Sequence, residues 1–162
     1  MYRIGHGYDI HRFDKEQQGE HQVMLCGVAL PCAYPVEAHS DGDVALHALM
    51  DAFLGAVGAG DIGEHFPNTD LTLRGISSVT LLERVLVVLK ERGYTIVNID
   101  LTILAETPKI SPMKAAMQQK LADILKIALD GINIKATTTE KLGAIGRREG
   151  IAVHCVALLQ KV

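Results

Sequence analysis

The sequence predicts an α+β fold in which one mixed sheet packs against a helical layer. Segments with alternating apolar residues are interleaved with segments whose apolar residues recur at helical spacing. The composition, 48% hydrophobic and 22% charged, is typical of a folded domain. No repeat, low-complexity tract or linker divides the 162 residues, so we expect residues 1–162 to form a single domain.

The first part of the chain predicts two strands and a helix. Residues 3–13 are expected to form a strand that carries polar side chains among glycines. A short strand over 23–30 is expected to end before the following proline, which lacks a backbone N–H. Helical spacing of apolar residues predicts a helix over about 41–57, with Ser40 and Asp41 as suitable caps.

The rest of the chain predicts two helices and three strands. Glycine ends the first of these helices, and alternate apolar residues mark the strands. The expected elements are a helix over 77–92, a strand over 95–104, a helix over 112–128, strands over 132–138 and 151–159, and a glycine-bearing loop at 140–147 between the last two strands.

The charge and the apolar runs exclude several classes of partner. A net charge of −3 and a pI near 6.1 give no basic field for nucleic acid or an anionic membrane. No apolar run is long enough to cross a bilayer, and the first residues lack a secretory signal or transit peptide. Three cysteines without paired spacing indicate buried thiols in a reducing compartment, so we expect a cytoplasmic protein.

Three residues suggest a metal site. Asp9 and His11 are two residues apart on a predicted strand and so share a face, and His47 on the predicted helix offers a third ligand. One carboxylate with two imidazoles suits a catalytic zinc, although a surface histidine on an acidic helix face would give the same pattern. Asp43 and Asp51 lie four residues on either side of His47, and we expect one of them to orient its ring.

Several other segments suit a phosphate ligand, each with a plainer interpretation beside it. His39 and Ser40 precede a predicted helix N-terminus, where anions bind, but Ser40 is also an ordinary cap. The run 137–140 offers hydroxyls and a carboxylate, although threonines are common in strands. The loop 105–111 is placed to wall a pocket. His6, His21, His65 and His154 have no such pattern and are expected to be structural.

Three longer strings carry a resemblance to a known family. They are Gly-His-Gly-Tyr-Asp-Ile-His at 5–11, His-Ser-Asp-Gly-Asp-Val-Ala-Leu-His at 39–47 and Lys-Ala-Thr-Thr-Thr-Glu-Lys-Leu-Gly at 135–143. In order and spacing they resemble the 2-C-methyl-D-erythritol 2,4-cyclodiphosphate synthases of non-mevalonate isoprenoid synthesis. The resemblance covers essentially the whole chain.

The resemblance implies a metal-dependent lyase acting on a cytidine diphosphate-linked substrate. It implies that Asp9, His11 and His47 bind zinc and that Glu140 binds a second divalent ion, magnesium or manganese. It assigns His39 and Thr138 to phosphate alignment and transition-state stabilisation. It also implies a homotrimer with each active site at a subunit interface, without nucleic-acid or membrane partners.

The resemblance further implies a set of substrate-contacting residues, in which Asp61 and Gly63 hold the erythritol portion and 105–111 with Thr137 and Thr138 form the cytidine pocket. The full set is Asp9, His11, His39, Ser40, Asp61, Ile62, Gly63, Phe66, Asn68, Asp70, Ala105, Pro108, Lys109, Ile110, Ser111, Thr137, Thr138, Thr139, Glu140, Ala144 and Arg147. Asn68 stands where the family often has aspartate, and Ala144 replaces a bulky aromatic residue.

The implied reaction is intramolecular phosphoryl transfer. The 2-phosphate of the substrate attacks the β-phosphorus of its own cytidine diphosphate group and expels CMP. A zinc phosphohydrolase that uses a metal-bound water, and a trimeric metal-binding protein without chemistry, are the alternatives. Neither accounts for both the loop 105–111 and the threonine-glutamate segment.

Overall fold

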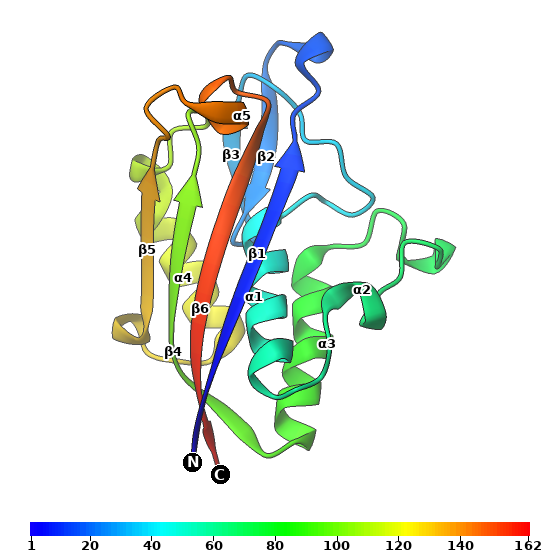
Figure 1. The fold of residues 1–162 in the computed structure, drawn as a ribbon, viewed down its shortest axis with the longest axis vertical. Helices are drawn as coiled ribbons and strands as arrows, with labels where there is room; N and C mark the ends of the chain where they lie inside the picture. Colours follow the sequence, from blue (N-terminus) through cyan, green and yellow to red (C-terminus); the bar gives the residue numbers. More distant parts are fainter.

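A computed structural model describes all residues from 1 to 162, and its centre is a four-stranded mixed sheet (Figure 1). The strands are β1 (Tyr2–Arg12), β4 (Tyr94–Leu104), β5 (Ile132–Thr137) and β6 (Gly150–Lys161), in the order β1-β6-β4-β5. β6 is antiparallel to β1 and to β4, whereas β4 and β5 are parallel. The prediction of an α+β fold with one mixed sheet is therefore confirmed.

Three helices cover one face of this sheet, as Figure 1 shows. They are α1 (Val44–Ala56), α3 (Ser78–Glu91) and α4 (Lys114–Leu125). None of them is long and apolar enough to cross a membrane. The short helices α2 (Ile62–His65) and α5 (Gly143–Gly146) lie in segments for which only turns and loops were predicted.

The segment predicted as one strand over 23–30 is in fact a hairpin of β2 (His21–Leu25) and β3 (Val28–Cys32). Cys26 and Gly27 form the turn, with φ of 53° and 74°, the left-handed values that a tight hairpin turn requires. The strand does not end before Pro31, which lies within β3. Because β3 pairs with a strand on one side only, it tolerates a residue without an N–H.

Helix α1 begins at Val44, three residues later than predicted, because Asp43 and not Ser40 or Asp41 is its cap. The Asp43 carboxylate accepts a hydrogen bond from the Leu46 N–H at 3.0 Å. The N–H groups of Leu46 and His47 are both bonded to Asp43, and the first turn of the helix is buried. The start of α1 is therefore not exposed to an anion in solution.

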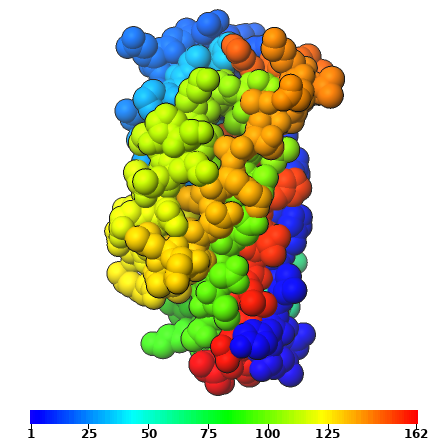
Figure 2. All heavy atoms as spheres, turned by 90° about the vertical axis from the view of Figure 1, so that its left-hand side faces the viewer, coloured from blue at the N-terminus to red at the C-terminus, as the bar shows by residue number.

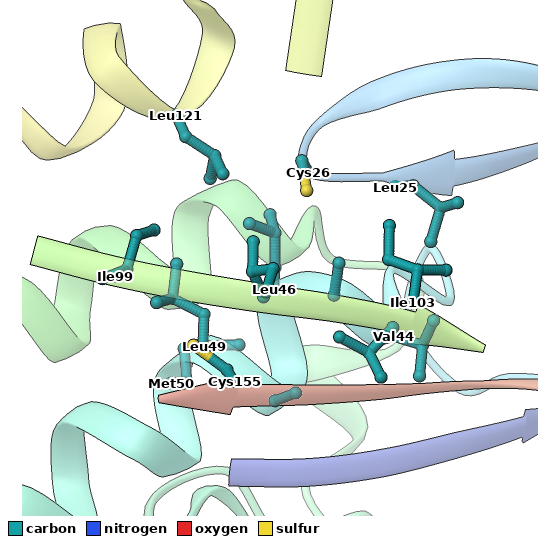
Figure 3. Close-up of a cluster of buried hydrophobic side chains, with 14 of the residues drawn as sticks. Leu25, Cys26, Val44, Leu46, Leu49, Met50, Ile99, Ile103, Leu121 and Cys155 are labelled. Carbon is teal, nitrogen blue, oxygen red and sulfur yellow. The ribbon is translucent and has the colours of Figure 1, made fainter. Parts of the chain in front are cut away.

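The core lies between the sheet and α1. Figure 3 shows Leu46 and Leu49 of α1 among Ile99 and Ile103 of β4 and Leu121 of α4. Cys26, Cys32 and Cys155 are free and buried, as predicted.

Glycines let α1 lie directly on β1. A Cβ at Gly5 or Gly7 would overlap with the carbonyl of Ala52 or Ala48, respectively. Because of this close approach, His47 of α1 can contact Asp9 and His11, which follow these glycines in β1.

Candidate metal centre and active site

Asp9, His11 and His47 form a compact cluster where β1 meets α1. Asp9 and His11 point from the same face of β1 toward the helix that carries His47. The Asp9 Oδ2 atom lies 2.9 Å from His11 Nε2 and 3.2 Å from His47 Nδ1. The two ring nitrogens are 3.2 Å apart. The sequence prediction of a three-residue cluster is therefore confirmed in its geometry.

Hydrogen bonds orient both rings, and one of them fixes the protonation of His11. His11 Nδ1 donates to the carbonyl oxygen of Gly42 at 2.8 Å, because a carbonyl can only accept. This leaves the lone pair of neutral His11 on Nε2. His47 Nε2 faces the hydroxyl of Ser78 at 3.0 Å, so its Nδ1 is the atom that faces the cluster.

The cluster fits a divalent cation. Two ring lone pairs and a carboxylate oxygen converge on one point, and a triangle with sides of 2.9 to 3.2 Å matches one face of a tetrahedron around a zinc-sized ion. Three protein ligands leave one position open for a substrate oxygen. The donor set of one oxygen and two nitrogens is also the one that zinc accepts in catalytic sites.

Contacts within the cluster shift the pKa values of Asp9 and His11. Burial alone would raise the pKa of Asp9, but its hydrogen bonds and ionic contacts with His11 and His47 outweigh burial and hold that pKa far below its usual range. Burial opposes the charging of His11, yet the contact with Asp9 raises the pKa of His11 above its ordinary value. Asp9 is thus ionised at neutral pH and ready to bind a cation.

Neither aspartate predicted to orient His47 has its carboxylate hydrogen-bonded to the His47 ring. The buried Asp43 carboxylate accepts backbone N–H bonds from Cys26, Gly27 and Leu46, and so joins the β2–β3 turn to the start of α1. Burial raises the pKa of Asp43. Asp51 instead accepts from the Ile62 N–H at 2.8 Å. Helical spacing correctly placed both residues near His47. It could not show that their carboxylates accept hydrogen bonds from backbone N–H groups instead.

A cavity of about 470 Å³ opens beside the cluster. Several residues predicted to contact substrate line it: Asp9, His11, His39, Ser40, Ile62, Gly63, Phe66, Asn68 and Asp70. Asp61 is not among the lining residues, because its carboxylate caps α2 by accepting from the Glu64 N–H. Sequence reasoning missed Glu37 and Arg74, and Arg74 is the one arginine or lysine that lines this cavity.

A second group of predicted residues lies at the opposite edge of the sheet. The segment 137–140 leaves the end of β5, and the loop 105–111 leaves the end of the adjacent strand β4. Two hydrogen bonds join them. The Ala105 N–H donates to the Thr137 carbonyl at 3.0 Å, and the N–H of Lys141, the residue after the segment, donates to the Glu106 carboxylate at 3.1 Å. Figure 2 shows this edge, with the residues after β5 in orange at its top. We call these two segments the β5-edge loops.

The β5-edge loops present mostly backbone and hydroxyl groups. The side chains of Ala105, Pro108 and Ile110 are buried, while Lys109 and Ser111 are exposed. Thr138, Thr139 and Glu140 lie in the turn that follows, and the Thr138 hydroxyl accepts from the Glu140 N–H at 3.3 Å. Any contact that the buried members make with a ligand would come from their backbone.

Ala144 and Arg147 lie apart from both groups, in and just after α5. Arg147 forms an ion pair with Glu149 at 2.8 Å. Ala144 borders a shallow hollow with Ile10 and Arg12 at the end of β1. None of this hollow's residues except His11 and Glu37 belongs to the cavity beside the metal cluster.

The remaining histidines take no part in the cluster. His6 Nε2 and His154 Nδ1 lie 3.0 Å apart on the open face of the sheet, with Tyr8 packed beside them. His21 and His65 each donate to a nearby carbonyl oxygen, of Gln17 and Ala59 respectively.

The YgbB family model matches residues 2–160 of the chain. The chain belongs to the YgbB family. A relative from Ectopseudomonas mendocina (strain ymp), named 2-C-methyl-D-erythritol 2,4-cyclodiphosphate synthase, is 54% identical to this YgbB-family chain over 98% of it and 99% of the relative.

Solved structures of relatives share the fold. The IspF CDP complex of Plasmodium falciparum is 34% identical, with a TM-score of 0.84 over 99% of this chain and 96% of that one. The bifunctional IspDF of Campylobacter jejuni is 41% identical, with a TM-score of 0.92. This YgbB-family chain is covered completely in that match but spans only 43% of the bifunctional protein.

Proposed function

We propose that this chain converts 4-diphosphocytidyl-2-C-methyl-D-erythritol 2-phosphate to 2-C-methyl-D-erythritol 2,4-cyclodiphosphate and CMP, in non-mevalonate isoprenoid synthesis. The observation that carries the proposal is the convergent cluster of Asp9, His11 and His47 in the lining of a cavity, in a chain whose relatives bear this enzyme's name. The cluster is suited to polarise a phosphoryl oxygen, and the cavity is large enough for a small phosphorylated sugar alcohol.

In the proposed reaction an oxygen of the 2-phosphate forms a bond to the β-phosphorus. The bond from that phosphorus to the oxygen bridging the α-phosphate breaks, and CMP leaves with that oxygen. No water and no protein nucleophile take part. The reaction is a phosphorus–oxygen lyase step, and its main barrier is the repulsion between two anionic groups that must meet.

The chain's residues would lower this barrier by binding and orientation. Asp9, His11 and His47 would hold zinc, and Glu140 a magnesium or manganese ion. When bound, these ions supply positive charge that neutralises the phosphoryl oxygens. His39 and Thr138 would align the phosphates, and the cavity around Gly63 would fold the flexible sugar alcohol into the geometry for attack.

The positions of the two groups support a homotrimer with active sites between subunits. In the order β1-β6-β4-β5 the strands that carry Asp9 and Thr137 are three spacings apart, about 14 Å. One diphosphate group cannot contact both groups within a single chain. A neighbouring copy would supply the β5-edge loops, and with them the cytidine pocket, to the metal cluster of the first.

The open face of the sheet supports such an assembly. It exposes a group of large apolar side chains, including Tyr2, Ile4, Tyr8 and Ile10 of β1 and Val156 of β6. A monomer would leave this group in water, whereas a second copy would cover it. The three free, buried cysteines agree with action in a reducing cytoplasm.

The decisive experiment incubates the purified chain with the proposed substrate, zinc and magnesium, and follows the products by phosphorus NMR. We expect equimolar CMP and a cyclic diphosphate, without incorporation of oxygen from ¹⁸O-labelled water. Linear products carrying solvent oxygen would indicate a hydrolase instead. An unchanged substrate in the presence of bound zinc would leave only a metal-binding protein.

A further inference from the structure

Ser78, the first residue of α3, lies behind the metal cluster. Its side chain is fully buried, and its Oγ atom is 3.0 Å from His47 Nε2. The same Oγ is 2.5 Å from a carboxylate oxygen of Asp41, whose other oxygen accepts the Ser78 backbone N–H at 3.0 Å. Asp41 therefore holds Ser78 by both its hydroxyl and its backbone.

The direction of these hydrogen bonds follows from the donors available. An ionised carboxylate can only accept, so the single hydroxyl proton of Ser78 goes to Asp41. The Ser78 oxygen keeps its lone pairs and must accept from His47 Nε2–H. The bonds thus run from His47 to Ser78 to Asp41. Ser40 Oγ is a weaker second neighbour of Nε2, at 3.3 Å.

We propose that Ser78, held by Asp41, is a positioning residue that keeps the proton of His47 on Nε2 and so presents the Nδ1 lone pair to the metal. The proposal rests on the metal site of the proposed function but not on its chemistry. His11 is fixed in the opposite sense, since its Nδ1 proton is held by Gly42 and its Nε2 lone pair faces the cluster. Each ring has its own partner, and the partners select different nitrogens.

The capping role at the start of α3 is already filled by the neighbour of Ser78. Ser77 is the N-cap of α3, and its hydroxyl accepts from the Val79 N–H at 3.2 Å. The helix start does not need the Ser78 hydroxyl as a cap. Ser77→Ala is consequently a matched control, because it removes a hydroxyl one residue away without touching His47.

The test measures zinc affinity by competition with a chromophoric chelator for the wild type, Ser78→Ala and Ser77→Ala. We expect Ser78→Ala to weaken zinc binding by about 10- to 100-fold, the usual effect of removing a partner of a metal-binding histidine. Ser77→Ala should bind zinc as the wild type does, although its melting temperature should fall. Equal zinc affinity in Ser78→Ala and the wild type would overturn the proposal.

A second measurement needs no variant. Nitrogen-15 NMR of the metal-free wild type at a pH where His47 is neutral should show Nε2 protonated and Nδ1 unprotonated. The opposite tautomer would overturn the proposal even if Ser78→Ala failed to fold. Both readouts are independent of turnover, so a chain with no cyclase activity could still confirm the role of Ser78, and the two failures stay distinguishable.

Discussion

The metal cluster and the β5-edge loops differ in how completely a single chain builds them. Around the cluster nearly every polar atom has a partner: Gly42 fixes His11, Ser78 fixes His47, and Asp43 gathers three backbone N–H groups. In the β5-edge loops Thr137, Thr138 and Glu140 are exposed, and Glu140 has no protein partner for its carboxylate. In our proposal one chain therefore contains a finished metal site and an unfinished phosphate site, and these belong to two different active centres.

Removing a ligand from the finished site should have the largest effect. His47→Ala leaves two ligands, and we expect loss of tight zinc binding together with a fall in turnover of at least about 10³-fold, since a metal contributes several kcal/mol to such a transition state. Circular dichroism should show an unchanged fold. Retention of near-full activity would remove the cluster from the mechanism.

A substitution in the unfinished site should lower turnover without changing zinc affinity. Glu140→Ala should lower turnover by roughly 10²-fold or more through loss of the second metal ion, while zinc affinity stays at the wild-type value. The contrast with His47→Ala, which loses both, tests whether the two regions bind different ions. A parallel loss of zinc in Glu140→Ala would contradict the separation.

Mixing the two inactive variants sharpens the comparison further. If each active site joins the cluster of one copy to the β5-edge loops of another, co-refolded His47→Ala and Glu140→Ala chains should recover activity. Random assembly of a cyclic trimer restores about a quarter of the sites, because each must combine two intact halves. Absence of any recovery in trimers shown to be mixed would place the whole site within one chain.

A substitution at Asp43 tests whether the hydrogen bonds around the cluster stabilise the fold. Asp43→Ala leaves the N–H groups of Cys26, Gly27 and Leu46 without their acceptor, and we expect a loss of about 2–4 kcal/mol in unfolding free energy. Chemical denaturation measures this directly. Asp51→Ala, which removes one such acceptor from a half-buried position, is the matched control and should be milder.

Arg74 should show the smallest effect. It is the only arginine or lysine that lines the cavity, and no carboxylate in the chain forms an ion pair with it. Arg74→Ala should raise the KM for the anionic substrate by about 10-fold, with kcat changed little, as expected for one exposed phosphate contact. Lys90→Ala, with the same change in charge on α3, should leave KM unchanged.

Periodicity predicted most of the fold because the central strands and the long helices keep one side toward the core over most of their length. The exception in β4 is Val97, which is exposed where the register shifts between Ile96 and Asn98. In β4 the side chains of Ile99, Leu101 and Ile103 are all buried, as their alternation indicated. The hairpin was missed because its apolar pattern continues through Cys26 and Gly27, so only the left-handed φ values of these residues reveal the turn. The order of apolar and polar side chains does not by itself predict such φ values.

The proposed metal ligands could be predicted because Asp9 and His11 share a strand face and the family strings include His47. Their supporting residues could not. Ser78 is the second of two adjacent serines at a helix start, and nothing in the sequence distinguishes it from the cap Ser77. Only the packing of α3 beside α1 brings its hydroxyl to His47.

The order of strands in the sheet has a consequence for synthesis. β1 pairs along its whole length with β6, so that Tyr2 lies opposite Gln160 and Arg12 opposite Gly150. The strand that carries Asp9 and His11 is made first, yet its only sheet partner is made last. On the ribosome β1 must therefore wait until residues 150–161 have emerged before it can pair, and we expect tight zinc binding only after that point.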